Sequence, residues 1–332
     1  MSLGEAMTDE QIIFLISQPR SGSTMLQAIL GSHPDIHTCT EPWIALPFVY
    51  ALKEEGAEFD FDGRLAEHGI KAFFKESGVD EEFYHSALNS FLTSLYHKAL
   101  SNTGKRIFLD KTPRYYEITS DLIKIFPNAK FIILYRHPLA VLHSILKTWV
   151  NGEIDKLYYH SRDLLVAPVK LRNFVSRHEK EICVVKYEDL VSSPQREIKK
   201  ICNYLQIEYL GEIVNYKSNV EWYFGDKNYK DKSAPDEESI DTWKNNLENK
   251  LHVNLSYYYL RELGENLVDS LGYDFSVALS HIQKYKPNEN DFKIWNTMIH
   301  SKYVVSVEEQ RLAVKENMKN SFIKKIYNKI MT

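Results

Sequence analysis

The stretch Ile12-Ile-Phe-Leu-Ile-Ser17, followed by Gln18-Pro-Arg-Ser-Gly-Ser-Thr24, decides the fold. The first part is a short apolar run, which predicts a strand buried on both faces. The second part predicts a tight turn, and the helical pattern of Thr24–Ser32 comes after it. Unpaired backbone N–H groups and the helix dipole point into such a turn. A strand, a turn and a helix in this order therefore predict an anion site.

Three further short apolar runs predict strands, over Arg106–Leu109, Lys130–Arg136 and Ile182–Lys186. Helical patterns lie between and after them, over Tyr116–Ile125, from Pro138 onward, over Gln195–Leu205 and from Thr242 to Leu271. Buried strands that alternate with helices form a parallel sheet with helices on both faces. The fold class predicted is therefore α/β, with a parallel sheet flanked by helices.

The patterning predicts one main domain over residues 8–275. Within it, residues 51–105 have apolar groups at helical spacing and many aromatic residues, and we expect a helical insert beside an acceptor pocket. Residues 276–332 are expected to form a C-terminal helical extension that ends in a lysine-rich part, Val307–Thr332. That part is either a solvated helix face or a surface for a partner or a membrane.

Composition narrows the classes of partner. Apolar residues make up 44% of the 332 residues and charged residues 26%, as in ordinary globular proteins. The net charge of −4 gives no attraction to nucleic acid, so an anionic ligand needs a local site. No stretch has the apolar length of a membrane span, and the N-terminus lacks a signal-peptide pattern. We expect a cytoplasmic protein without a nucleic-acid partner or transmembrane segment, and of open oligomeric state.

The three cysteines, Cys39, Cys183 and Cys202, are odd in number and sparse. They argue against a disulfide framework and against a zinc site. No spaced set of histidine and carboxylate ligands is visible either, so we expect no metal.

The turn after the first strand has the chemistry of a phosphate or sulfate loop. Gly22 permits close approach of the backbone, and Arg20 adds a forked cation. Ser21, Ser23 and Thr24 add hydroxyl donors. Neither G-x-x-x-x-G-K-[ST] nor G-x-G-x-x-G is present, which disfavours an ordinary ATP-dependent kinase. Taken alone, the motif is equally compatible with a serine-rich helix cap.

Five segments together resemble the sulfotransferases that use 3′-phosphoadenosine 5′-phosphosulfate (PAPS), and in particular their tyrosylprotein-sulfotransferase-like branch. They are Gln18–Leu26, Ser32–Pro42 with Asp110–Pro113, Phe126–Ser144 and Lys186–Leu190. The resemblance implies a P-loop-NTPase-like fold with helical insertions. The chain departs from the branch in lacking a membrane address, which favours a bacterial-type soluble enzyme.

The resemblance also implies a role for individual residues. Glu41 would be the catalytic base, and Lys111 would contact the oxygen that bridges sulfate and phosphate. The remaining family positions would bind the donor: the 5′-phosphosulfate by Arg20, Ser21, Gly22, Ser23, Thr24 and Met25, the 3′-phosphate by Arg136 and Ser144, and the nucleotide by Tyr187 and by Lys232 in a closing loop. The branch's second 3′-phosphate arginine is unmatched, because Thr148 stands near that position, and Lys147 is a candidate substitute.

Several assignments keep alternatives. His33, His37, His143 and His252 compete with Glu41 for the role of base. Lys111 could pair with Asp110 or Glu117 on the surface, Arg136 could be a plain surface arginine, Ser144 could be a packing serine, and Lys232 could belong to a solvated loop.

The function predicted is transfer of a sulfuryl group from PAPS to a hydroxyl of a small molecule, a carrier-protein-bound acyl chain or a saccharide. Transfer would be an in-line displacement that leaves 3′,5′-adenosine bisphosphate and needs no metal. The alternative is a nucleotide-dependent phosphotransferase on the same strand–loop–helix layout. A non-enzymatic nucleotide-binding adaptor is disfavoured because Arg20, Glu41 and Lys111 occur together.

Overall fold

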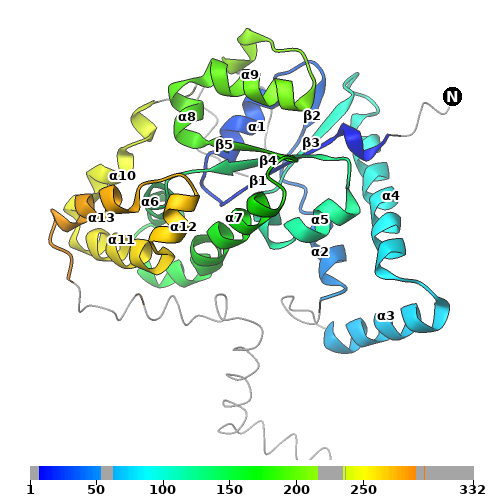
Figure 1. Cartoon of the computed structure of the whole chain (residues 1–332), viewed down its shortest axis with the longest axis horizontal. Coiled ribbons are helices and arrows are strands. Elements are labelled where there is room, and N and C mark those ends of the chain that lie inside the picture. Colours follow the sequence, from blue (N-terminus) through cyan, green and yellow to red (C-terminus); the bar gives the residue numbers. More distant parts are fainter. Residues whose placement is uncertain (1–6, 54–62, 216–234, 236, 289–294, 296–332) are drawn as a thin grey trace, which may run out of the picture.

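A parallel sheet forms the centre of the computed structural model, which describes residues 7–53, 63–215, 235, 237–288 and 295 (Figure 1). Its five strands follow the order β2-β3-β1-β4-β5. Their bounds are Ile12–Ser17 for β1, Ile36–Thr38 for β2, Ile107–Lys111 for β3, Lys130–Tyr135 for β4 and Ile182–Lys186 for β5. All four neighbouring pairs run parallel, which confirms the predicted fold class.

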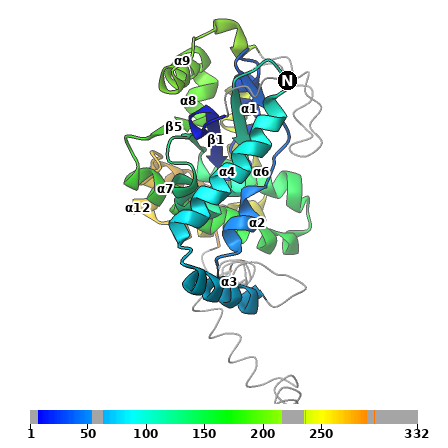
Figure 2. The same cartoon turned by 90° about the vertical axis from the view of Figure 1, so that its right-hand side faces the viewer.

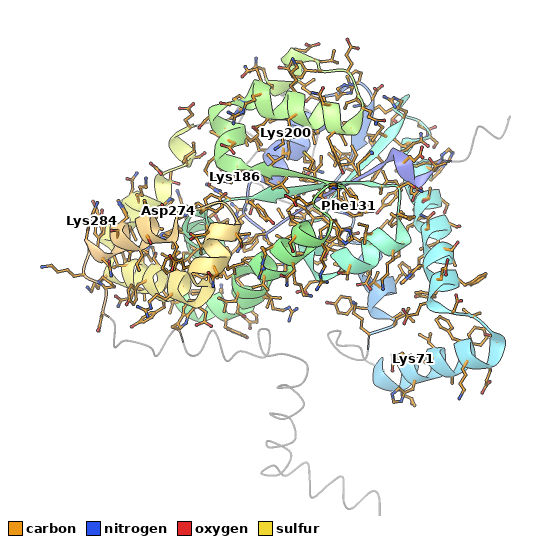
Figure 3. The ribbon with its side chains drawn as sticks, viewed as in Figure 1. Lys71, Phe131, Lys186, Lys200, Asp274 and Lys284 are labelled. Atoms are coloured by element: carbon orange, nitrogen blue, oxygen red, sulfur yellow. The ribbon has the colours of Figure 1, made fainter. Side chains whose placement is uncertain are left out.

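Strand β1 is central because both of its faces are apolar. All six of its residues are buried. Phe14 belongs to the hydrophobic cluster on one face, while Ile13 and Leu15 belong to the cluster on the other. The Phe14 ring stacks on Phe131 of β4, with the ring centroids 5.4 Å apart, and Phe131 lies in the middle of the molecule in Figure 3. Continuous apolar runs, rather than alternating ones, are therefore what this two-sided core requires.

Helices cover both faces of the sheet (Figure 1). One face carries α1 (Ser23–Gly31), α8 (Tyr187–Ser192) and α9 (Pro194–Leu205). The other face carries α4 (Glu81–Leu100), α5 (Thr119–Ile125), α6 (Pro138–Ile145) and α7 (Ala167–Arg177). The remaining helices are α2 (Ala45–Tyr50), α3 (Gly63–Ser77), α10 (Thr242–Asn245), α11 (Lys250–Leu263), α12 (Glu265–Ser270) and α13 (Phe275–Gln283).

The structure differs from the predicted elements in three places. Strand β2 is only three residues long, too short for a visible pattern. The strand expected over Arg106–Leu109 lies at Ile107–Lys111 and so carries Lys111 at its end. The helix expected from Thr242 to Leu271 is divided into α10, α11 and α12, because Asn249 caps a new helix and Gly264, at φ 75°, ends it.

Part of the sequence-based account lies outside the described residues. Lys232 and the lysine-rich part Val307–Thr332 both do. The described portion of residues 51–105 holds α3 and α4, in keeping with a helical insert, and the domain boundaries stay a prediction. Of the helices the structure describes, none combines the length and the apolar character needed to cross a bilayer.

Candidate functional site

Chemically active side chains gather where the strands end. The loop Gln18–Thr24 follows β1, Glu41 comes shortly after β2, and Lys111 closes β3. Arg136 follows β4, and Tyr187 follows β5, whose last residue Lys186 is labelled in Figure 3. The carboxyl ends of parallel strands share one edge of a sheet, and ligands bind there in open α/β folds. All five strands therefore deliver a predicted site residue or segment to the same edge.

The loop after β1 is built around two left-handed residues, Arg20 at φ 70° and Gly22 at φ 92°. A Cβ atom added to Gly22 would lie 2.4 Å from the Tyr187 ring, so only glycine fits between that ring and the start of α1. Helix α1 then begins at Ser23 with its N-terminal end facing the site. Such an N-terminus favours an anion.

The Ser21 hydroxyl oxygen in this loop and Arg136 Nε beside it are buried and make no hydrogen bond to the described part of the chain. Buried polar atoms are almost always satisfied in a finished structure. A hydroxyl and a guanidinium N–H in this position suit the oxygens of a bound phosphate or sulfate.

Arg136 is fixed by the surrounding chain. Its Nη1 donates to the Arg20 carbonyl oxygen at 3.0 Å, and its Nη2 donates to the Ser239 carbonyl oxygen, also at 3.0 Å. Its guanidinium lies 4.2 Å from the centroid of the Tyr187 ring, and the Tyr187 hydroxyl is 2.6 Å from the Ser239 hydroxyl. The alternative of a plain surface arginine is therefore wrong. Ser239 is a contact that the sequence did not indicate.

The Arg20 side chain turns toward α6 and the π turn after it, Leu146–Val150. Its Nε donates to the Ser144 hydroxyl at 3.2 Å, and its Nη2 donates to the Thr148 hydroxyl at 3.4 Å. Its guanidinium also lies over the Trp149 ring, 5.4 Å from the centroid. Arg20 thus fills space beside Ser144, whereas Lys147 is exposed. This places a cation next to Thr148, where the sequence shows none.

Glu41 and Lys111 form a close ion pair, with Lys111 Nζ 2.5 Å from Glu41 Oε1. The lysine side chain is 2% exposed and that of the glutamate 13%. Lys111 Nζ also lies 3.5 Å from the Thr24 hydroxyl, and Trp43 Nε1 donates to Glu41 Oε2 at 3.1 Å. The pair therefore joins the loop after β1 to the segment after β2.

The surface pairings considered for Lys111 are wrong, because both carboxylates have other partners. Glu117 binds Arg162 and Lys170, with N–O distances of 2.7 and 2.6 Å. Asp110 is fully buried and accepts hydrogen bonds from Tyr96 and Tyr115 at 2.6 and 3.3 Å, and from Thr112 at 2.8 Å.

Asp110 holds the segment that carries Glu41. Thr112, which donates to Asp110, accepts the backbone N–H of Trp43 at 3.4 Å, and Tyr115 accepts that of Ala45 at 3.1 Å. Burial raises the pKa of Asp110 to about 6, although its three hydrogen bonds act in the opposite direction. The sequence suggests Asp110 only as a surface partner of Lys111, and its place beside Lys111 is the only signal for a structural role.

A second carboxylate, Asp163, orders the outer wall of the site. Arg114 donates two hydrogen bonds to it, at 2.9 and 2.6 Å, and Gln18 Nε2 donates to its carbonyl oxygen at 2.7 Å. Burial alone would raise the pKa of Asp163, but the hydrogen bonds led by Arg114 hold it below its ordinary value. The Arg114 guanidinium lies 5.6 and 5.8 Å from the ring centroids of Trp43 and Trp149. Sequence spacing could not reveal this cluster.

Three of the histidines that compete with Glu41 for the role of base make contacts typical of structural residues. His33 follows α1, at the opposite edge of the sheet, where its ring bonds to Glu208 O and Asp35 N at 3.0 and 3.1 Å. His143 Nε2 lies 2.8 Å from the Ser256 hydroxyl, and burial, then His252, lower its pKa to about 3. His37 packs edge-on against Phe108.

Within the described ranges, no group of three or more histidine, cysteine or carboxylate side chains is arranged to hold a metal ion. The three cysteines are free thiols, and Cys183 and Cys202 are buried core residues.

Comparison with known proteins gives consistent relatives. A profile of the Sulfotransferase family matches residues 12–210. Nodulation protein NoeE of Sinorhizobium fredii (strain NBRC 101917 / NGR234) is 27% identical over 306 residues, which are 80% of this chain and 67% of that protein. Protein-tyrosine sulfotransferase 1 of Danio rerio is 28% identical over 214 residues, 63% of this chain and 57% of its own length.

The solved sulfotransferase domain from the curacin biosynthetic pathway superposes with a TM-score of 0.54 at 24% identity, over 79% of this chain and 98% of that domain. This likeness confirms the predicted P-loop-like fold.

Proposed function

Because this chain belongs to the sulfotransferase family, we propose that it transfers a sulfuryl group from PAPS to a hydroxyl group of an acceptor. The observation that carries the choice of donor is the pair of anion-binding positions at one sheet edge. One is the loop at the N-terminus of α1, with its buried Ser21 hydroxyl. The other is the group of Arg136, Ser144 and Arg20. A donor with a 5′-phosphosulfate and a 3′-phosphate needs both.

The 5′-phosphosulfate would lie against the loop. Ser21, Ser23 and Thr24 supply hydroxyls, and the amides up to Met25 supply the helix N-terminus. Gly22 leaves no side chain between the backbone and Tyr187, and Tyr187 would face the nucleotide. Backbone N–H groups at a helix N-terminus are well suited to an oxyanion because they are already oriented before the ligand arrives.

The 3′-phosphate would lie between Arg136 and Ser144. The free Nε of Arg136 supports this assignment, because the two Nη atoms already hold the neighbouring backbone. The side chain of Arg20 lies next to Ser144, while its backbone is part of the loop after β1. We therefore propose that Arg20 contributes to both anion positions. Lys232 remains a candidate for closing over the nucleotide, outside the described residues.

Glu41 and Lys111 are proposed to carry the transfer step. The acceptor oxygen would attack the sulfur and form the new S–O bond, while the bond from sulfur to the bridging phosphate oxygen breaks. Glu41 would accept the proton lost by the acceptor hydroxyl. Lys111 would stabilise the negative charge on the departing oxygen of 3′,5′-adenosine bisphosphate. The near-complete burial of Lys111 supports this role, because a fixed charge acts more strongly where water is excluded.

The acceptor would approach from the side of Trp43, whose indole N–H holds Glu41. Trp43, Trp149 and the Arg114 guanidinium form a partly exposed aromatic and cationic wall there. Such a wall is compatible with a small alcohol, a carrier-bound acyl chain or a saccharide. We propose a hydroxyl acceptor from these three classes.

The experiment is a transfer assay with PAPS labelled at sulfur and a panel of alcohols from the three classes. The proposal expects label in at least one product, with loss of transfer in Glu41→Gln and full transfer in the control Glu153→Gln, whose side chain is exposed. Transfer of a labelled phosphoryl group from ATP, with none from PAPS, would contradict it.

A further inference from the structure

Helix α4 is apolar on two faces. One face packs into the core through Leu88, Leu92, Tyr96 and Leu100. The second consists of Phe83, Ala87, Phe91 and Leu95, which we call the α4 face. All four residues are exposed, Phe83 by 65%, Phe91 by 43% and Leu95 by 41%. A surface helix needs only one apolar face to pack on the core. The second apolar face of α4 therefore requires its own explanation.

Neighbouring helices enlarge this surface. Phe48 of α2 contacts Phe91 edge-on, with ring centroids 5.1 Å apart, and is itself 37% exposed. Phe74 of α3 contacts Tyr84 of α4, with ring centroids 5.6 Å apart, and its neighbour Phe73 is 60% exposed. Figure 2 looks at this side of the molecule and shows α4 in front, with α2 and α3 below it. Contiguous exposed apolar surface of this kind marks interaction sites in globular proteins.

The spacing of the α4 face suits a second helix. Its residues recur every four positions and so form one ridge of the kind that interdigitates in the commonest class of helix packing. A twofold axis between Ala87 and Phe91 would set Phe83 of one copy against Leu95 of the other. It would also set the small Ala87 against the large Phe91. The ridge is therefore self-complementary when the two helices run antiparallel.

The charges at the ends of α4 have the same symmetry. Exposed Asp80 and Glu81 stand at its N-terminal end, and exposed His97 and Lys98 stand at its C-terminal end. Asp80 and Lys98 lie 18 positions apart, which is five helical turns, so they share one side of the helix. In the antiparallel arrangement, the acidic end of each copy meets the basic end of the other, and opposite charges at the rim fix register.

We infer that the α4 face binds the α4 face of a second copy of this chain, in an antiparallel, twofold-symmetric dimer. An isologous contact of this type needs one surface that complements itself, which the ridge and its charged ends provide. A membrane surface would favour lysines along the rim. An acidic protein would be repelled by Asp80 and Glu81. Both are tested below as other occupants.

The experiment measures the mass of the full-length chain in solution by sedimentation over a range of concentrations. The chain mass is 38.8 kDa, and the wild type should sediment with twice that mass. Phe91→Glu and Leu95→Gln should each raise the dimer dissociation constant by about tenfold or more, the usual effect of removing a buried anchor. Both residues are exposed, and circular dichroism checks that each variant is folded. The control is Val277→Gln on α13, an apolar residue that is 65% exposed, and this change should leave the dimer unchanged.

Charge variants test the orientation. Lys98→Glu should weaken the dimer, because it faces Asp80 of the other copy. Adding Asp80→Asn should recover part of the loss, since asparagine keeps the helix cap that Asp80 forms with the Phe83 N–H. A wild type that stays at 38.8 kDa at every concentration overturns the inference. So does a dimer that survives both apolar substitutions, or a monomer that binds anionic phosphatidylserine vesicles or an acidic carrier protein through Phe91.

Discussion

Lys111 Nζ lies 2.5 Å from Glu41 Oε1, so the proposed cation and the proposed base of the transfer step are paired with each other. In this structure the Lys111 ammonium therefore occupies one oxygen of the Glu41 carboxylate. In the proposed mechanism, Lys111 has to shift toward the departing oxygen, which frees Glu41 to take the acceptor's proton. We therefore propose that the pair links donor binding to activation of the base.

Substitutions of Glu41 and Lys111 should each cause a large loss of turnover, and the two losses should be coupled. We expect Glu41→Gln to lower kcat by about 10²–10⁴-fold, the contribution of a positioned general base. Lys111→Ala should cost about 10²–10³-fold, as for loss of a donor at a developing charge. Because the two side chains touch, the double variant should lose less than the product of the single losses. Steady-state kinetics with saturating PAPS measure all three, and full rates in either single variant would rule out the proposed roles.

Substitution of Gly22 should reduce nucleotide affinity, in addition to the loss of stability caused by backbone strain. Gly22→Ala places a Cβ against the Tyr187 ring at 2.4 Å, and the left-handed backbone adds about 1–2 kcal/mol. Gly78→Ala is the matched control, because Gly78 also has a positive φ, 73°, but open space around it. Both variants should be destabilised in urea, and only Gly22→Ala should lose affinity for 3′,5′-adenosine bisphosphate. Equal affinities in the two variants would contradict the loop assignment.

The Arg20 side chain should bind the 3′-phosphate and not the 5′ end, because its guanidinium donates hydrogen bonds to the Ser144 and Thr148 hydroxyls. Arg20→Ala should weaken 3′,5′-adenosine bisphosphate by about tenfold to a hundredfold, the value of a charge-assisted hydrogen bond. The same substitution should lower the affinity for adenosine 5′-monophosphate much less, because this nucleotide lacks the 3′-phosphate. Lys147→Ala is the control, since Lys147 is exposed. Calorimetry supplies the dissociation constants, and equal losses for both nucleotides would assign the side chain to the 5′ end.

Asp110 should make stability depend on pH in an unusual direction. Its pKa is about 6 in the folded chain, above its ordinary value of 3.8, so the folded state holds the proton more tightly than the unfolded chain. The contribution of Asp110 to the free energy of unfolding is therefore present below pH 3.8 and is lost as the pH rises toward 6. The free energy of unfolding of the wild type minus that of Asp110→Asn isolates the contribution of Asp110. His137 and His143, whose pKa values are lowered and act in the opposite direction, contribute equally to both proteins.

Urea unfolding at pH 4, 5, 6 and 7 checks the Asp110 prediction. The stability of the wild type relative to Asp110→Asn should fall across the lower part of this range and then level off. A difference that rises with pH would show that the carboxylate is stabilised as an anion in the folded state.

Much of the sheet could be predicted from the sequence because its strands are continuous apolar runs. Ile12–Ser17 and Ile182–Lys186 coincide with β1 and β5. The roles expected of Lys111 and Arg136 came from the family resemblance, and the structure then brings both to the edge where the parallel strands end. The three-residue strand β2 was too short to be visible.

Contacts between distant segments could not be predicted. The Arg114–Asp163 pair spans 49 positions and depends on how the π turn Arg162–Val166 meets the segment after β3. The direction of the Arg20 side chain and the three hydrogen bonds that hold Asp110 depend on packing, which no local pattern encodes. The α4 face was visible only as aromatic residues in the expected insert, because exposure is a property of the folded chain.

We propose above that the sheet edge binds a nucleotide with both a 5′ and a 3′ phosphate. Calorimetric titration with 3′,5′-adenosine bisphosphate, beside ATP with magnesium, measures this preference. We expect the bisphosphate to bind at least about tenfold more tightly than ATP. Arg136→Ala should lose most of that preference, while the control Arg196→Ala, on the exposed surface, should keep it. Binding of magnesium ATP without binding of the bisphosphate would show that the sheet edge is not a site for a nucleotide with a 3′-phosphate.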